Sequence, residues 1–243
     1  TTLTNPDTTS NLILIEPHRQ FSQELQLSSP SNGALTWTAG LYYFHEKAGY
    51  DPVHLYGPLY YVPSNIPPEF QATDIFYQTR SKTDSFAAYA QATYRLGAST
   101  RVTGGFRYTW ERRKIGIDSF VYIPVPGLEG VPFASPSVAD KKNFKAPTWR
   151  VSIDHDFTPD ILGYVSYNRG FKSGGFNPAQ TYNAPGGVAY QPEKLDAYEV
   201  GLKTQTPDHR VRVNVAAFLY QYRNIQVESF ANQILNISNG ARA

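Results

Sequence analysis

The stretch GFKSGG at residues 170–175 combines a lysine, a serine and three glycines, the residue types of a phosphate-binding loop. Such a loop needs glycines between a strand and a helix, with Gly-Lys-Ser/Thr at its end. Here Phe171 separates Gly170 from Lys172, and the following FNPAQTYNAPGG contains two prolines and paired glycines, which do not favour a helix. We interpret the stretch as the end of a strand that enters an exposed loop.

The triplet Asp154-His155-Asp156 resembles a metal or acid–base cluster, but neighbours on a strand point to opposite sides. The five histidines lie at positions 18, 45, 54, 155 and 209 without metal-ligand spacing. Neither a nucleophile elbow nor a paired-histidine motif is present. The sequence therefore predicts no catalytic residue, no metal site and no cofactor, and the protein is not expected to be an enzyme.

Composition narrows the class of protein further. Its 22 basic and 20 acidic residues give a net charge of +2, without the excess of basic residues that is typical of nucleic-acid-binding proteins. Cysteine is absent, which excludes a disulfide framework and suits passage through an oxidising periplasm. Methionine is also absent and no signal peptide opens the chain, so we expect a piece of a longer protein. No run approaches the roughly 18 apolar residues of a transmembrane helix.

The recurrent pattern along the chain has a period of two, which is typical of strands. Between residues 100 and 113, Val102, Phe106, Tyr108 and Trp110 share one face, while Arg101, Thr103, Arg107, Thr109 and Glu111 share the other. Ten strands are predicted, at residues 11–15, 19–28, 34–47, 82–96, 100–117, 145–156, 161–171, 193–205, 209–227 and 233–243. Most are about as long as a membrane-crossing strand, which needs about 9–11 residues.

Short and long connections alternate along the chain. The short ones, at 29–33, 97–99, 157–160 and 206–208, contain the Pro, Gly, Asn, Asp and Ser that tight turns favour. The long ones cover residues 48–81, 118–144 and 172–192. All tight turns should therefore lie at one end of the strands, as in outer-membrane barrels. The predicted fold class is all-β, an antiparallel up-and-down meander of about ten strands forming part of a larger transmembrane β-barrel.

Alternation alone does not say which face meets water, because a soluble sandwich has the same pattern. An Arg on a lipid-facing position near the midplane costs about 2–4 kcal/mol. Five strand arginines lie on the polar parity of their strands: Arg101, Arg107, Arg150, Arg210 and Arg212. Aromatic residues also gather near the long-loop ends, where barrels have an interfacial girdle. In a barrel, the predicted lumen-facing residues are Arg101, Arg107, Glu111, Arg150, Asp154, Arg210 and Arg212.

The predicted loop at 48–81 is the best candidate for ligand binding, because tyrosines are rigid amphipathic surfaces enriched at recognition sites. Polar residues of this loop and of the strand end near residue 172 would add specificity. The predicted ligand-binding residues are Tyr50, His54, Tyr56, Tyr60, Tyr61, Arg80, Lys172 and Asn177. The alternative is a loop that folds over its own aromatic side chains and shields the barrel mouth.

Several stretches, in order and spacing, resemble the β-barrel of TonB-dependent outer-membrane receptors, of the type that takes up iron complexes and siderophores. They are FSQELQLSSPSNGALTWTAGLYYFHEK, SFAAYAQATYRLGASTRVTGGFRYT, WRVSIDHDFTPDILGYVSYNRGFKSGGFN, AYEVGLKTQ and VRVNVAAFLYQYRNIQV. The resemblance implies a barrel of about 22 strands with an N-terminal plug. Residues 1–243 would then be a partial barrel domain, without the plug and the C-terminal strands. The haem-receptor signature is absent.

The resemblance also implies a function and partners. Such a receptor binds a ferric siderophore or similar bulky nutrient and imports it across the Gram-negative outer membrane with energy relayed through TonB. The implied partners are the TonB–ExbB–ExbD complex, reached through the plug, the ligand, and outer-membrane lipid and lipopolysaccharide; nucleic acid is not among them. Two other functions stay open from the residues: a passive porin-type channel, and a soluble β-rich carbohydrate-binding module.

Overall fold

The computed structural model describes residues 11–56, 74–122, 132–134, 137–177, 188–231 and 234–240. Every regular element in these residues is a β-strand, and all strand pairs are antiparallel, which confirms the predicted all-β meander. Within the same residues, no helix has the length and apolar character needed to cross a membrane.

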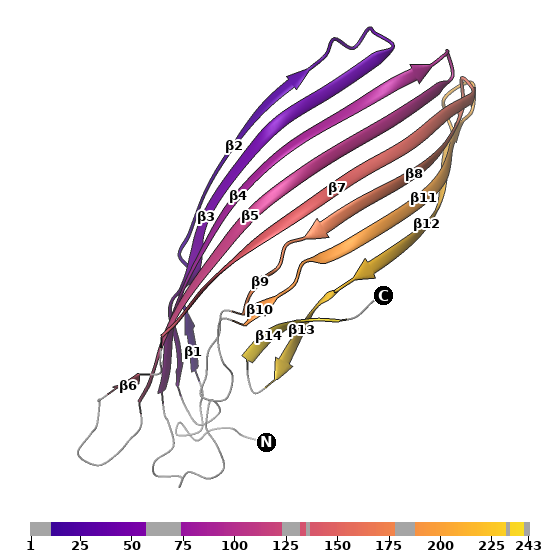
Figure 1. The fold of residues 1–243 in the computed structure, drawn as a ribbon. Coiled ribbons are helices and arrows are strands. Elements are labelled where there is room, and N and C mark those ends of the chain that lie inside the picture. The colour runs from indigo at the N-terminus through magenta and orange to yellow at the C-terminus, as the bar shows by residue number, and fades with distance from the viewer. Residues whose placement is uncertain are drawn as a thin grey trace, which may run out of the picture.

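One large curved sheet dominates the structure (Figure 1). Its strands follow the order β1 (Asn11–Leu14), β3 (Leu35–Tyr56), β4 (Asp74–Leu96), β5 (Thr100–Tyr122), β7 (Val138–Thr158), β8 (Ile161–Lys172), β11 (Glu193–Gln205) and β12 (Arg212–Arg223). Strand β2 (His18–Ser28) also pairs with β3, and β6 (Pro132–Ala134) pairs with β5. Two small hairpins complete the fold: β9 (Gly175–Phe176) with β10 (Ala189–Tyr190), and β13 (Gln226–Ala231) with β14 (Ile234–Asn239).

The tight turns all lie at one end of the large sheet, at the upper right in Figure 1. They join β2 to β3, β4 to β5, β7 to β8, and β11 to β12. We call this the turn end, and the opposite end the loop end. The separation follows the predicted alternation of short and long connections.

Several strands run further towards the loop end than the sequence predicts. The strand predicted at 34–47 should end before Gly49, yet β3 continues to Tyr56 because its pairing with β4 resumes after a register shift between Tyr50 and Val53. Such an irregularity accommodates a proline, which has no N–H to donate. The predicted loops at 48–81 and 118–144 are therefore partly strand.

The predicted strand at 209–227 is wrong in two respects. It begins only at Arg212, because His209 adopts a φ of 57° in the preceding turn. It also breaks at Asn224, with a φ of 54°, so that β13 leaves the large sheet. Arg210 consequently lies in the exposed turn beside Asp208, and its prediction as a lumen-facing strand residue is wrong.

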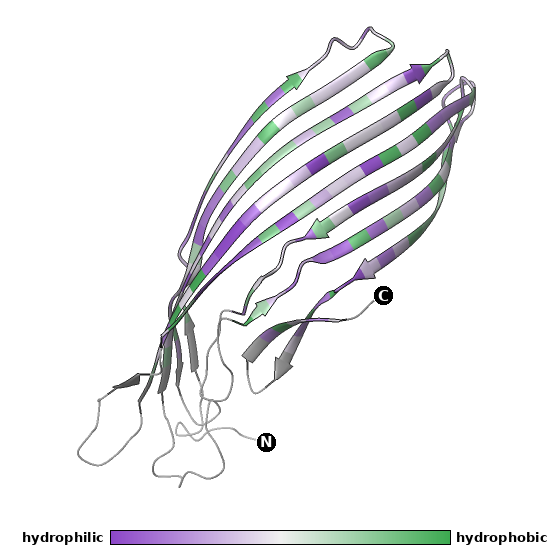
Figure 2. Ribbon diagram, viewed as in Figure 1, coloured by the Kyte–Doolittle hydropathy of each residue, from purple (hydrophilic) through white to green (hydrophobic). Residues whose placement is uncertain are grey.

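The two faces of the large sheet differ in chemistry. The β9–β10 hairpin packs on one of them, where Phe176 contacts Ile115 and Ile117 of β5; we call this the inner face. Along the turn-end half, the inner face buries small polar side chains: Thr103, Thr109, Ser152 and Ser166. The other, outer face exposes large apolar side chains: Phe106, Val151, Ile153, Val165, Val200, Val213, Val215 and Leu219. The alternation of colours along each strand in Figure 2 reflects this arrangement.

This distribution is the reverse of a soluble sandwich, in which the apolar face would be covered by a second sheet. Phe106 is 51% exposed and Val213 is 49% exposed. The strand register assigns the predicted lumen residues to a face, because directly opposed residues of neighbouring strands lie on the same side of the sheet. Six of them lie on the inner face: Arg101, Arg107, Glu111, Arg150, Asp154 and Arg212.

The polarity of the two faces inverts within single strands near the loop end. On β5, Val102 and Phe106 point outward, whereas Ile115 and Ile117, nearer the loop end, are buried inward. The outward positions beyond Trp110 are Arg112, Lys114, Gly116 and Asp118. From Thr100 to Trp110, about ten steps of about 3.3 Å tilted by about 40° span about 25 Å, the height of a barrel's apolar band.

Adjacent residues of β12 offer a test of this assignment. We expect Val215→Arg, on the outer face, to destabilise the intact protein by up to about 4 kcal/mol, because the guanidinium would face hydrocarbon. Asn214→Arg, one residue away on the inner face, should cost less than about 1 kcal/mol. Urea unfolding in lipid vesicles measures both values; equal costs for the two variants would contradict the assignment.

Candidate functional site

The ligand-binding residues predicted for one loop do not form one surface. Tyr50, His54 and Tyr56 lie in β3 and Arg80 lies in β4, so their placement in a loop is wrong. Tyr50 lies on the inner face, since it is opposite the buried Thr79, whereas Arg80 forms an ion pair with Asp118 on the outer face. Tyr60 and Tyr61 lie outside the described residues.

The inner-face tyrosines at the loop end form a packed pair. The rings of Tyr50 and Tyr77 meet edge to face with centroids 6.4 Å apart. Burial raises the pKa of Tyr77 to about 12 and, to a smaller extent, the pKa of Tyr50. Both phenols therefore stay neutral at physiological pH. This contact supports the alternative that aromatic side chains shield the mouth by packing on one another.

Asn177 holds the structure together and does not face a solvent-filled site. Its side chain is buried; its amide nitrogen donates to the carbonyl of Ile237 at 2.9 Å, and its amide oxygen accepts from the N–H of Ile237 at 2.7 Å. These two bonds imitate a strand pair between the segment after β9 and β14. In this conformation both polar atoms of Asn177 form structural hydrogen bonds, and its role in ligand binding stays a prediction.

Other side chains continue this clamp between the two small hairpins. The side chain of Gln226 donates to the carbonyls of Ser173 and Gln191, at 2.9 and 3.1 Å. The side chain of Asn239 donates to the carbonyls of Gln191 and Asn224, at 3.0 and 2.9 Å. The β13–β14 hairpin, which left the large sheet at Asn224, is thereby tied to the β9–β10 hairpin on the inner face.

Charged and polar side chains pair across strands on the inner face. The guanidinium of Arg101 donates two hydrogen bonds to Asp156, at 2.6 and 3.0 Å. The hydroxyl of Tyr164 donates to Glu199 at 2.5 Å, and its ring lies over Gly201, where a Cβ would be only 2.5 Å from the ring. Asp156 is thus paired with Arg101.

Arg107 lies close to two tyrosine rings on this face. Its guanidinium lies 5.2 Å from the ring centroid of Tyr42 and 5.8 Å from that of Tyr89. The hydroxyl of Tyr89 in turn donates to Glu24 at 2.7 Å. Sequence reasoning missed Glu24 and Tyr89, because residues 65 positions apart give no local signal of their contact.

Arg107 and Tyr89 border a shallow groove of about 420 Å³ on the inner face. Arg107 and Arg150, both predicted from sequence to face the lumen, line this groove together with Gln91 and Asn168. Arg150 is exposed, and Arg107 donates only to Thr109, at 3.3 Å, among the described residues. The groove therefore offers two guanidinium groups and a tyrosine ring to an anionic, partly aromatic molecule. Lys172 lies further towards the loop end, exposed at the end of β8.

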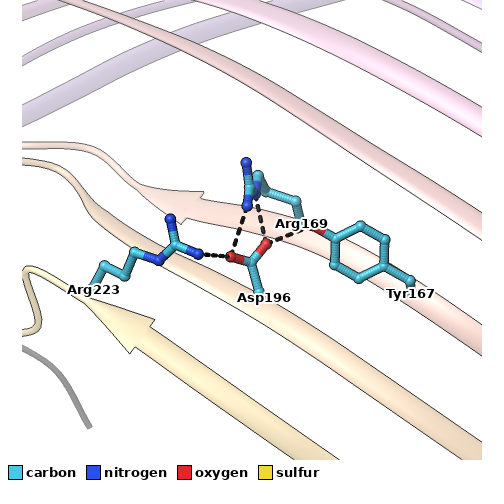
Figure 3. A network of polar contacts seen from close by, with 4 residues as sticks. All are labelled: Tyr167, Arg169, Asp196 and Arg223. Carbon is cyan, nitrogen blue, oxygen red and sulfur yellow. Dashed lines mark hydrogen bonds and ion pairs between the residues drawn. The ribbon is translucent and has the colours of Figure 1, made fainter.

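A second polar network lies on the outer face, at the loop-end side of β8, β11 and β12 (Figure 3). Asp196, whose side chain is 2% exposed, accepts two bonds from Arg169 at 2.6 and 2.7 Å. It also accepts from the hydroxyl of Tyr167 at 2.8 Å and pairs with Arg223 at 3.1 Å. Arg169 stacks on Trp149, 4.4 Å from its ring centroid. One carboxylate is shared by two guanidinium groups, so this network keeps a net positive charge.

No group of three or more His, Asp or Glu side chains in the described ranges could hold a metal ion. The large sheet forms a wall with an apolar outer face. Its inner face carries polar side chains that pair across strands, and a shallow cationic groove. A wall of this kind, with its tight turns gathered at one end of the described sheet, is the geometry of a section of an outer-membrane barrel.

A comparison with protein families shows which family of barrels this sheet belongs to. The model of the TonB dependent receptor-like β-barrel matches residues 2–243. The chain belongs to this family. Barrels of the family lie in the outer membrane of Gram-negative bacteria and serve as transport receptors; it is not an enzyme family. The expected resemblance is therefore confirmed.

Two solved receptor structures share the fold. The ferric yersiniabactin uptake receptor of Yersinia pestis is 20% identical with a TM-score of 0.73, over 95% of this chain and 32% of that receptor. The ferric-catecholate import receptor of E. coli K12 is 16% identical with a TM-score of 0.56, over 94% of this chain and 34% of that receptor. The present chain thus spans about a third of the length of these receptors.

The clamp made by Asn177 can be tested directly. Asn177→Ala removes both bonds to Ile237 and leaves a backbone N–H and carbonyl without partners. We expect the β13–β14 hairpin to lose about 1–3 kcal/mol of local stability. Hydrogen exchange at the amide of Ile237 should then accelerate by about tenfold or more. Asn236→Ala, on an exposed neighbour in β14, is the control; an unchanged exchange rate at Ile237 in Asn177→Ala would contradict the clamp.

Proposed function

We propose that this receptor barrel binds a ferric siderophore or similar bulky nutrient outside the cell and imports it with energy relayed through TonB. The single observation that carries the proposal is the membership of residues 2–243 in the receptor barrel family. The two receptors described above are named for the ferric complexes that they take up, which supports the iron half of the proposal. Its place would be the Gram-negative outer membrane.

The inner face supports the same proposal through its chemistry. Siderophores bind ferric iron through anionic oxygen donors, and their complexes are bulky and often aromatic. The groove presents Arg107 and Arg150 beside the ring of Tyr89, a combination that suits such a complex through charge-assisted and cation–π contacts. In the proposed mechanism no covalent bond is made or broken; the ligand passes along this wall once the plug has moved.

The partners follow from the proposal. The TonB–ExbB–ExbD complex would act on the plug, and outer-membrane lipid and lipopolysaccharide would surround the outer face. The rival function is a passive porin-type channel, which would transport without an energy source. A dependence of transport on TonB therefore separates the two functions.

Uptake measurements test the proposal as a whole. We expect deletion of the gene that encodes this chain to abolish accumulation of radioactive iron from one member of a panel of ferric siderophores. Uptake in the parent strain should stop when the proton gradient is collapsed or TonB is removed. Uptake that continues without TonB would favour the porin; a defect restricted to a sugar or to cobalamin would refute the iron ligand.

The groove yields a more local prediction. Replacing Arg107 or Arg150 with Ala should weaken binding of the transported complex by about tenfold each, since each removes a charge-assisted contact of about 1.4 kcal/mol. Arg112→Ala, which removes the same charge from the opposite face of β5, is the matched control. Equilibrium binding of the ferric complex to the intact receptor measures the effect; equal losses in Arg112→Ala and Arg107→Ala would contradict a role for the groove.

A further inference from the structure

Five basic side chains lie side by side across five neighbouring strands on the outer face. In the strand register, the directly opposed pairs are Arg19–Lys47, Lys47–Lys82, Lys82–Lys114 and Lys114–Lys141. We call these five residues the basic row. Opposed residues on one face of a sheet have Cβ atoms about 4.5–5.5 Å apart. The basic row is therefore a continuous line of positive charge about 20 Å long.

The protein itself neutralises little of this charge. Within the described residues, Lys82 is the one member of the basic row with an ion pair, 3.6 Å from Asp84. Asp84 is also bonded to His45 at 2.7 Å, so it is shared. The side chains of Arg19, Lys47, Lys114 and Lys141 are exposed. Like charges directly opposite one another destabilise a sheet, so a row of five needs counter-charges from elsewhere.

The basic row has a fixed position relative to the apolar band. Four residues closer to the turn end along the same strands, the outer face carries Tyr43, Phe86 and Trp110, of which the last two have ring centroids 6.0 Å apart. Four residues correspond to about 13 Å along a strand, and to about 10 Å in height at a tilt of about 40°. Aromatic residues mark the edge of the hydrocarbon. The basic row then lies at the level of the lipid headgroups.

The outer-face network of Figure 3 adds positive charge beside aromatic residues on β8, β11 and β12. Arg169 and Arg223 share the single carboxylate of Asp196, and Lys194 lies directly opposite Arg223 in the register. Here too the cations lie beside aromatic rings, since Arg169 stacks on Trp149. Positive charge thus borders the aromatic residues at two separate places on the outer face.

We propose that the basic row binds the phosphate groups of lipid headgroups in the leaflet around the loop end of the barrel. A headgroup with several phosphates, such as that of a phosphorylated glycolipid, matches a line of cations about 5 Å apart better than a single-charge headgroup does. The inference rests on the proposed function only for the placement of the barrel in an outer membrane. It assigns the headgroup contact to named residues of β2, β3, β4, β5 and β7.

Binding of diphosphorylated lipid A to the intact receptor in a neutral detergent tests the proposal. A lysine near an anionic lipid surface contributes about 1 kcal/mol, or about fivefold in affinity. The triple variant Lys47→Gln, Lys114→Gln, Lys141→Gln should therefore bind lipid A about 100-fold more weakly than the wild type. Without lipid, the same variant should unfold at a temperature equal to or above that of the wild type, because the repulsion is relieved.

Two controls keep the result specific. Lys142→Gln removes a lysine adjacent to Lys141 in sequence but on the inner face, near the ring of Phe144, and should leave lipid A affinity unchanged. Inorganic pyrophosphate at the same concentration should not compete, because it lacks the acyl chains that lie on the apolar band. Equal affinity of the wild type and the triple variant, an equal loss in Lys142→Gln, or full competition by pyrophosphate would each overturn the proposal.

Failure of this proposal can be told apart from failure of the proposed function. Lipid A affinity is measured in detergent without any transported ligand or TonB. Loss of the lipid effect with intact uptake of a ferric complex would refute only the basic row. The reverse result, lipid binding with no TonB-dependent uptake, would refute only the transport function.

Discussion

The contact between the outer face and hydrocarbon is the constraint on which the rest of the structure depends. Lipid tails do not accept hydrogen bonds, so every backbone group must pair within the sheet and every outward side chain must tolerate an apolar solvent. Phe106, Val151 and Val213 satisfy this demand where water would penalise them. The inversion on β5, from Phe106 outward to Ile117 inward, shows where the demand ends. Beyond that point the strand follows the ordinary rule for a protein in water.

The same constraint sends the polar side chains inward, where they have little room and must find partners. Cross-strand pairs such as Arg101–Asp156 and Tyr164–Glu199 meet this need and fix neighbouring strands to one another. A carboxylate left alone on such a face would carry a desolvation cost. Arg107 and Arg150 are different, because part of their donor capacity remains available. A rigid wall with a few incompletely paired cations suits a transport path. Cations that are fully paired within the protein would have no hydrogen-bond donors available for a passing ligand.

Period-two alternation and turn composition were enough to predict the strand class, the separation of the turns, and the faces of residues such as Val102 and Arg107. They failed where the structure depends on a partner far away in sequence. The continuation of β3 past Pro52 depends on β4, and the burial of Asn177 depends on the backbone of Ile237, 60 residues later. The cross-strand register is likewise invisible in one sequence. Lys47, Lys82, Lys114 and Lys141 are separated by at least 27 positions, and only the pairing of four strands places them in one line.

That line of cations makes sense energetically only together with its surroundings. Four directly opposed like-charge pairs, at about 0.2–1 kcal/mol each, would cost about 1–4 kcal/mol, a large fraction of a typical stability of about 5–15 kcal/mol. Five cations at an anionic lipid surface would gain about 5 kcal/mol in total, which reverses the sign. The same strands thus face hydrocarbon on the turn-end side of the aromatic residues and phosphate groups on the loop-end side. Hydrocarbon favours Val and Phe on the outer face. Phosphate groups make a row of lysines tolerable on the same face, four residues further along the strands.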